Sequence, residues 1–199
     1  MKDIIFDLGG VLIDWNPRYL YRKVFATEEQ TEWFLANVCT PQWNTQQDAG
    51  RPFEEGIEQL KAKYPQYAFA IQFYATRWEE MLGGVIEGSV DILRKLKTRG
   101  YRVYALSNWS METLPIVQKK YGFFNAFDGM VISGEEKLVK PDPRIYARLL
   151  KKYDLHAPNC IFIDDNPANI SKAADLGFET ILFTDPDALH RTLINRAVL

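Results

Sequence analysis

The hydrophobic pattern changes twice along the chain. Near the start, the apolar run Ile4-Ile5-Phe6 predicts a short buried strand over residues 3–8. From about residue 16 to residue 82, apolar residues recur at helical spacing instead. We predict four helices in this block, over residues 17–24, 28–38, 53–62 and 67–82. The block therefore reads as a helical bundle that follows a single strand.

After Gly88, short apolar runs alternate with helical segments. We predict strands over 102–106, 130–132, 160–163 and 180–183, and helices over 90–98, 111–120, 143–152, 168–176 and 186–195. This alternation is typical of a parallel sheet covered on both faces. We therefore predict an α/β fold, a Rossmann-like doubly wound parallel sheet with an inserted helical-bundle cap. Residues 1–15 and 84–199 would form the core, and residues 16–83 the cap.

Composition narrows the class of partner. The chain has 199 residues, 47% of them hydrophobic, and a formal net charge of −2. The sequence has no basic stripe that would indicate binding to nucleic acid. It also has no long apolar or polybasic stretch that would indicate a membrane. Only two cysteines occur, Cys39 and Cys160, which is typical of a reducing compartment. We expect a cytoplasmic protein, a monomer or homodimer, that acts on a small molecule.

Four polar segments follow predicted strands of the sheet. They are Asp7-Leu8-Gly9-Gly10-Val11, Ser107-Asn108, Lys140-Pro141-Asp142 and Asp164-Asp165. Ligands of open parallel sheets bind at the carboxyl ends of the strands, so we expect these segments to meet there. Together they supply a carboxylate nucleophile, a hydroxyl, an ammonium group and an acidic pair. Those groups suffice to bind Mg²⁺ and to transfer a phosphoryl group through an aspartyl intermediate.

Each segment alone also has a purely structural interpretation. Ser107 could cap the helix that follows it, and Lys140 could be a solvated surface residue. Asp165 could be an acid at the N-terminus of a helix. Two adjacent acids after a buried strand repel each other unless a cation lies between them, and Mg²⁺ prefers such hard oxygen ligands. The functional interpretation rests on all four segments ending strands of one sheet.

The same segments resemble those of a known family. The stretches are Phe6-Asp7-Leu8-Gly9-Gly10-Val11-Leu12, Leu106-Ser107-Asn108, Lys140-Pro141-Asp142-Pro143-Arg144-Ile145-Tyr146 and Ile163-Asp164-Asp165-Asn166-Pro167-Ala168-Asn169-Ile170. They resemble the haloacid dehalogenase superfamily, and within it the phosphatase-like members with a small helical cap. The last stretch is similar to that of bacterial sugar-1-phosphate phosphatases.

The resemblance implies a role for each residue. Asp7 would attack phosphorus and carry the aspartyl-phosphate. Ser107 and Lys140 would hold the phosphoryl group, and Asn108 lies beside them as a further substrate contact. Mg²⁺ would bind the carboxylates of Asp7, Asp164 and Asp165 and the backbone carbonyl of Gly9. Asn169 would order the loop rather than touch the substrate.

Gly9 departs from the family pattern. Most phosphatases of the superfamily carry an aspartate there as general acid and base, a group that contributes about 10²–10⁴-fold. Haloacid dehalogenases also lack it, because a halide leaves without a proton, and they need no metal. A 2-haloacid dehalogenase and a non-catalytic binding protein are therefore the alternatives. The pair Asp164-Asp165 favours a Mg²⁺-dependent phosphatase for a small phosphorylated metabolite such as a sugar phosphate.

The cap is expected to select the substrate. The polar stretch Trp43–Arg51 is predicted as a connection between two cap helices that reaches down to the site. Arg51 and Asp48 are its candidate contacts to a sugar or a phosphate. Closure of such a cap would exclude water from the leaving group.

Overall fold

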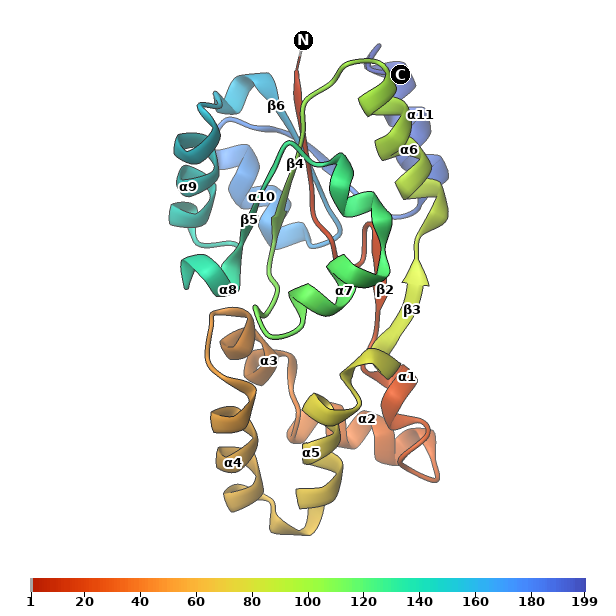
Figure 1. Ribbon diagram of the computed structural model, residues 1–199, viewed down its shortest axis with the longest axis vertical. Coiled ribbons are helices and arrows are strands. Elements are labelled where there is room, and N and C mark those ends of the chain that lie inside the picture. Colours follow the sequence, from red (N-terminus) through yellow and green to blue (C-terminus); the bar gives the residue numbers. More distant parts are fainter. Residues whose placement is uncertain (1) are drawn as a thin grey trace.

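The computed structural model describes residues 2–199, and it has an α/β core above a helical cap (Figure 1). Five parallel strands form the core sheet in the order β5-β4-β1-β6-β7. The strands are β1 (Asp3–Phe6), β4 (Val103–Ser107), β5 (Gly129–Ile132), β6 (Cys160–Asp164) and β7 (Glu179–Leu182). The predicted doubly wound parallel sheet is confirmed.

Alternate residues of the buried strands face opposite layers of helices. On β1, Ile4 and Phe6 belong to one hydrophobic cluster, while Ile5 belongs to the other. The first cluster includes residues of α6 (Glu87–Thr98), α7 (Leu114–Lys120) and α11 (Pro186–Asn195). The second includes residues of α9 (Pro143–Tyr153) and α10 (Pro167–Asp175). Because both faces of the sheet are covered, its strands are almost wholly apolar.

The cap consists of short helices. They are α1 (Arg18–Tyr21), α2 (Glu28–Asn37), α3 (Pro41–Asp48), α4 (Phe53–Lys63) and α5 (Ala68–Thr76), with 3-10 turns η1 (Pro65–Tyr67) and η2 (Trp78–Met81). Aromatic side chains fill its interior: the ring of Tyr21 lies 4.7 Å from that of Phe34 and 6.4 Å from that of Tyr74. Tyr21, Phe34 and Tyr74 are therefore core residues of the cap. No helix within residues 2–199 combines the length and the apolar character needed to cross a bilayer.

The structure corrects two predicted elements of the cap. The stretch predicted as a connection, Trp43–Arg51, is helical as far as Asp48. Its start signal precedes the stretch: the Thr40 hydroxyl accepts a hydrogen bond from the Trp43 amide at 3.1 Å, and Pro41 occupies the first turn. The helix predicted over 67–82 ends at Thr76, after which η2 leads into another strand.

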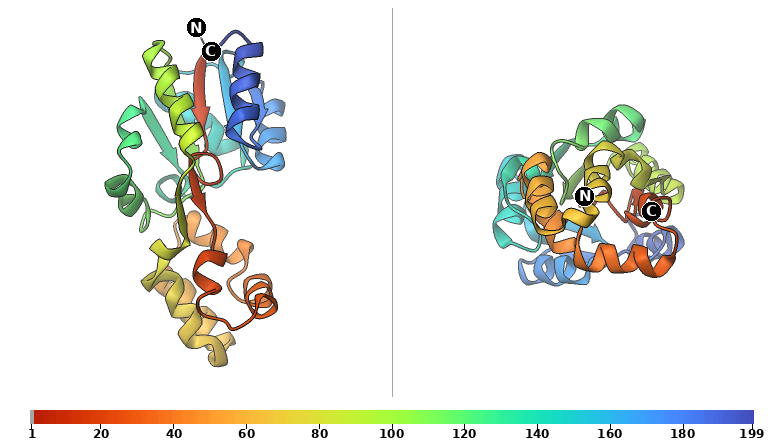
Figure 2. Two further views of the ribbon diagram at one scale, coloured as in Figure 1. Left: turned by 90° about the vertical axis from the view of Figure 1, so that its right-hand side faces the viewer. Right: turned by 90° about the horizontal axis from the view of Figure 1, so that it is seen from below.

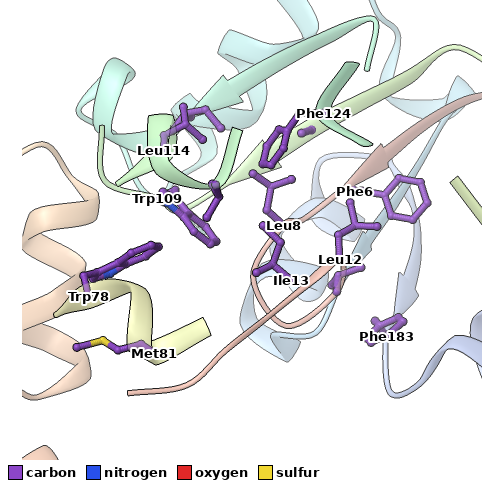
Figure 3. Close-up of a cluster of buried hydrophobic side chains, with 14 of the residues drawn as sticks. Phe6, Leu8, Leu12, Ile13, Trp78, Met81, Trp109, Leu114, Phe124 and Phe183 are labelled. Carbon is purple, nitrogen blue, oxygen red and sulfur yellow. The ribbon is translucent and has the colours of Figure 1, made fainter. Parts of the chain in front are cut away.

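A two-stranded ribbon joins the cap to the core. The strands β2 (Ile13–Trp15) and β3 (Leu82–Val85) are antiparallel, with Ile13 opposite Val85 and Trp15 opposite Leu82. Neither strand was predicted from the sequence, and the first residue of β3, Leu82, was assigned to the helix predicted over 67–82. Figure 2 shows the chain leaving and re-entering the core side by side along this ribbon. Beside it, hydrophobic residues continue from the core sheet to the cap, where Trp78 meets Trp109 edge to face at 5.8 Å (Figure 3).

Candidate active site

The register of the central strands brings two acids together. Phe6 of β1 lies opposite Ile163 of β6, and the Asp7 amide donates to the Ile163 carbonyl at 2.9 Å. The next residue on each strand is an aspartate, Asp7 and Asp164, and Asp165 follows. Carboxylate oxygens of Asp7, Asp164 and Asp165 lie within 4.8 Å of one another. The sequence expectation that these segments meet at one sheet edge is confirmed for all three acids.

Lys140 lies between two of these carboxylates. Its Nζ is 3.0 Å from Asp7 Oδ1 and 2.6 Å from Asp164 Oδ2, and it donates to the Leu106 carbonyl at 2.8 Å. The Lys140 side chain is fully buried. Burial by itself would lower the pKa of this ammonium group, but the charges of Asp7 and Asp164 outweigh burial and raise the pKa. Lys140 therefore stays cationic at the centre of the site.

Without a bound cation, the pKa of the Asp7 carboxyl lies close to neutral pH. Burial raises its pKa from 3.8 to about 7; Lys140 opposes that rise, and the charge of Asp164 adds to it. The Leu8 amide donates to Asp7 Oδ1 at 2.7 Å. A cation placed among the acids would favour the ionised form, which is the form a nucleophile requires.

Asp164 is held by hydrogen bonds on both oxygens. Asn169 Nδ2 lies 3.1 Å from each oxygen, and the Asn166 amide donates to Oδ1 at 2.8 Å. The Tyr146 hydroxyl in turn donates to the Asn169 carbonyl at 3.1 Å. Asn169 therefore orders this loop, as the sequence suggested.

Two polar residues end β4 beside β1. Ser107 is buried, and its hydroxyl lies close enough to Asp7 to lower the pKa of that carboxyl. Within residues 2–199, no hydrogen bond of good geometry engages the Ser107 Oγ, which leaves it available to a ligand. Asn108, which the sequence assigned to substrate, uses its amide on Lys140: Oδ1 accepts from the Lys140 amide at 2.8 Å, and Nδ2 donates to the Lys140 carbonyl at 3.0 Å. This side chain anchors Lys140, although Asn108 also lines the cavity described below.

The donor set of this edge fits a Mg²⁺ ion. Three carboxylates supply hard oxygen ligands, and Mg²⁺ is usually held by few protein carboxylates with water completing its shell. Gly10, with φ of +76°, makes room for one of them, because a Cβ there would lie 2.3 Å from Asp165 Oδ2. Asp7, Asp164 and Asp165 are thus the residues that would hold the metal, and Gly9 lines the same cavity.

A cavity of 330 Å³ lies over these groups, between core and cap. Its lining residues are Asp7, Gly9, Gly10, Trp15, Asn44, Asp48, Phe53, Trp78, Asn108, Trp109, Ser110, Thr113 and Asp165. The cap contributes Asn44, Asp48, Phe53 and Trp78, so the stretch predicted to reach the site does so. Arg51 is not among the lining residues. Its Nε donates to Gln47 Oε1 at 2.6 Å, and its Nη1 donates to Gln59 Oε1 at 2.8 Å.

The aromatic wall of the cavity was not predicted from the sequence. Trp15, Phe53, Trp78 and Trp109 come from four separate segments, and large apolar side chains of this kind are usually core residues. Trp109 directly follows Ser107-Asn108, and this adjacency was the signal available. Trp15 lies at the end of ribbon strand β2, and Phe53 and Trp78 reach the cavity because the cap lies over the sheet edge.

The chain belongs to the haloacid dehalogenase-like hydrolases, whose family profile matches residues 1–177. It is 27% identical over 190 residues to a sesquiterpene phosphatase of Aspergillus oryzae, a match covering 92% of this chain and 90% of that protein. It is 30% identical over 93 residues to an (S)-2-haloacid dehalogenase of Burkholderia cepacia, covering 47% of this chain and 40% of that one. A HAD family enzyme of Bacteroides thetaiotaomicron, solved as a magnesium complex, shares the fold with a TM-score of 0.73 at 23% identity, covering 93% of this chain and 94% of that chain.

Proposed function

We propose that this hydrolase is a Mg²⁺-dependent phosphatase that cleaves a small phosphorylated metabolite through an aspartyl-phosphate on Asp7. The observation that carries the proposal is that carboxylate oxygens of Asp7, Asp164 and Asp165 lie within 4.8 Å of one another, with the buried ammonium group of Lys140 paired to Asp7 and Asp164. We place the reaction in the cytoplasm, where the buried free thiols of Cys39 and Cys160 would stay reduced.

The residues of the site divide the work of phosphoryl transfer. Asp7 supplies the oxygen that attacks phosphorus, and the P–O bond to the leaving group breaks. The Lys140 ammonium group and the Ser107 hydroxyl would stabilise the phosphoryl oxygens as negative charge redistributes. A bound Mg²⁺ would supply Lewis-acid stabilisation of the phosphoryl group. Water then releases inorganic phosphate from Asp7, and the cap limits the access of bulk water to the cavity.

The acidic pair also weighs against the dehalogenase alternative. A dehalogenase attacks an sp³ carbon and gains nothing from a cation site beside its nucleophile. The match to the haloacid dehalogenase covers 47% of this chain, whereas the match to the phosphatase covers 92%. The phosphatase proposal thus accounts for Asp165, which the alternative leaves without a role.

The cavity limits the substrate to a small molecule. The cavity has a volume of 330 Å³. Four aromatic side chains line it, together with the polar groups of Asn44, Ser110 and Thr113. A sugar phosphate would use both kinds of surface. The similarity to a sesquiterpene phosphatase adds a short isoprenoid phosphate as a second substrate to assay.

Phosphate release from sugar phosphates, an isoprenoid phosphate and p-nitrophenyl phosphate tests the proposal. We expect release in Mg²⁺, none in excess EDTA, and full recovery when Mg²⁺ is restored. Halide release from 2-haloacids that is indifferent to EDTA would instead identify a dehalogenase. Binding of Mg²⁺ and phosphate without turnover of any compound would identify a binding protein.

Asp165→Ala should raise the Mg²⁺ concentration needed for half-maximal activity by at least about 10-fold, because it removes one oxygen ligand of a site with few. Burial and the charge of Asp164 raise the pKa of Asp165, and a nearby cation would favour the ionised form of this acid. The measurement is a Mg²⁺ titration of phosphate release. Asp175→Ala, an exposed acid on the following helix, is the matched control. Coincident titration curves for the two variants would remove Asp165 from the metal site.

A further inference from the structure

Within residues 2–199, the core side of the cavity offers no carboxyl group or histidine that is free to protonate the leaving group. Gly9 occupies the position two residues after Asp7 and has no side chain, and the Trp109 ring lies 3.4 Å from where a Cβ would be. Of the 13 residues that line the cavity, three carry a carboxyl group, and none is a histidine. Asp7 and Asp165 are already assigned to attack and to metal binding. The remaining carboxyl group belongs to Asp48, which comes from the cap.

The backbone of Asp48 is tied to the core beside the site. Its carbonyl accepts a hydrogen bond of 2.5 Å from the Ser133 hydroxyl. The same hydroxyl oxygen accepts a hydrogen bond of 2.9 Å from the Trp109 amide. Ser133 therefore joins the C-terminal end of α3 to the loop that carries Trp109. Gly50, just beyond, packs closely here, since a Cβ on it would lie 3.0 Å from the Gly134 carbonyl.

The carboxyl of Asp48 is oriented by a chain of hydrogen bonds within the cap. Asn44 Nδ2 donates to Asp48 Oδ2 at 2.9 Å, and the Tyr74 hydroxyl donates to Asn44 Oδ1 at 2.9 Å. Within residues 2–199, no hydrogen bond engages the other oxygen, Oδ1, and no ion pair holds the group. One oxygen is thus fixed by the amide, and the other is left to carry a proton into the cavity.

We propose that Asp48 is the general acid that protonates the leaving group, and then the general base that activates water, in place of the side chain that Gly9 lacks. This inference rests on the proposed phosphatase function. Burial, with the charge of Asp7 as a second cause, raises the pKa of Asp48 from 3.8 to about 7, so the group is substantially protonated at neutral pH.

The two half-reactions balance with Asp48 as the only proton carrier. In the first, an Asp7 oxygen bonds to phosphorus, the bond from phosphorus to the leaving oxygen breaks, and that oxygen takes the proton of Asp48. In the second, the Asp48 carboxylate takes a proton from water as the water oxygen bonds to phosphorus. The bond from phosphorus to Asp7 then breaks. Asp7 is again a carboxylate, Asp48 is again protonated, and inorganic phosphate leaves.

A pair of substrates separates proton donation from a structural role of Asp48. Nitrophenolate leaves p-nitrophenyl phosphate without needing a proton, whereas the alkoxide of benzyl phosphate needs one. The kinetic constant kcat/KM reports the first half-reaction, in which the leaving group departs. For Asp48→Asn we expect kcat/KM to fall about 10²–10⁴-fold on benzyl phosphate but by less than about 10-fold on p-nitrophenyl phosphate.

Glu112→Gln is the matched control, because it weakens a contact between cap and core but leaves the carboxyl groups of the cavity in place. Glu112 lies outside the cavity lining, and its Oε1 accepts a 2.7 Å hydrogen bond from the Phe53 amide, which ties cap to core. This variant should change kcat/KM on both substrates by the same factor. An equal loss on both substrates in Asp48→Asn, or no loss on benzyl phosphate, would overturn the inference. If the unaltered enzyme in Mg²⁺ releases phosphate neither from these two compounds nor from the sugar and isoprenoid phosphates, the proposed phosphatase function itself fails.

Discussion

Asp7→Asn should lower phosphate release by about 10⁴-fold or more while the protein stays folded. An amide of the same shape cannot attack phosphorus, and loss of a nucleophile costs an enzyme this much or more. The measurement is single-turnover phosphate release in Mg²⁺ on the best substrate found. Residual turnover near that of the unaltered enzyme would remove Asp7 as the nucleophile.

In the presence of EDTA, the free energy of unfolding of Asp7→Asn should increase with pH relative to that of the unaltered protein. The pKa of Asp7 is raised from 3.8 to about 7, so the folded state binds a proton that the unfolded state has released. This contribution to stability is complete below about pH 4 and is lost as pH rises through about 7. Asn carries no such dependence. Urea unfolding at several pH values measures the difference, and parallel pH profiles of the two proteins would contradict it.

Lys140→Met should lower the free energy of unfolding by about 3–5 kcal/mol at pH 8 in EDTA. The ammonium group lies 3.0 Å from Asp7 and 2.6 Å from Asp164, and all three side chains are almost completely buried. Methionine keeps the volume but leaves two buried carboxylates without a counter-ion. Urea unfolding followed by circular dichroism measures the loss.

The loss in Lys140→Met should shrink as pH falls. The charge of Lys140 opposes the raised pKa of Asp7, so without it the folded protein binds a proton at Asp7 still more readily than the unfolded chain does, and stability falls as pH rises. Lys172→Met is the control, because Lys172 pairs with Asp175 on the exposed surface at 3.2 Å, and such pairs contribute about 0–1 kcal/mol. Equal unfolding midpoints for the two variants would show that the Lys140 pairs add no net stability.

The core was predictable from the sequence because its strands are buried on both faces and therefore read as continuous apolar runs. The strand Cys160–Asp164 and its neighbours stand out for this reason, and the acids that follow them fall at one edge through parallel register. The ribbon between core and cap carries no such signal. Its strand Leu82–Val85 contains two glycines and no long apolar run, and it is strand only because Ile13–Trp15 lies beside it.

The cap side of the site was harder to predict for a different reason. Helix α3 has a polar sequence because one face lines the cavity and another meets solvent, so hydrophobic spacing does not reveal it. The partners of its residues come from distant segments: Asn44 meets Tyr74, and the backbone of Asp48 meets Ser133. Arg51 carries a charge that suits a phosphate, yet its guanidinium lies with Gln47 and Gln59 in the cap. Side-chain type alone does not distinguish these placements.

The ribbon of β2 and β3 makes the cap an exchangeable module. Trp15 and Leu82, where the chain enters and leaves the cap, are paired neighbours. Because the two ends already meet, replacing the insert by a longer or shorter one changes loop-closure entropy only slowly with length. The parallel sheet, with Asp7 and the pair Asp164-Asp165, would not need to be rebuilt. Natural variation or engineering can therefore replace the substrate-facing half of this hydrolase as a unit, but under our proposal each new cap has to bring its own proton donor in place of Asp48.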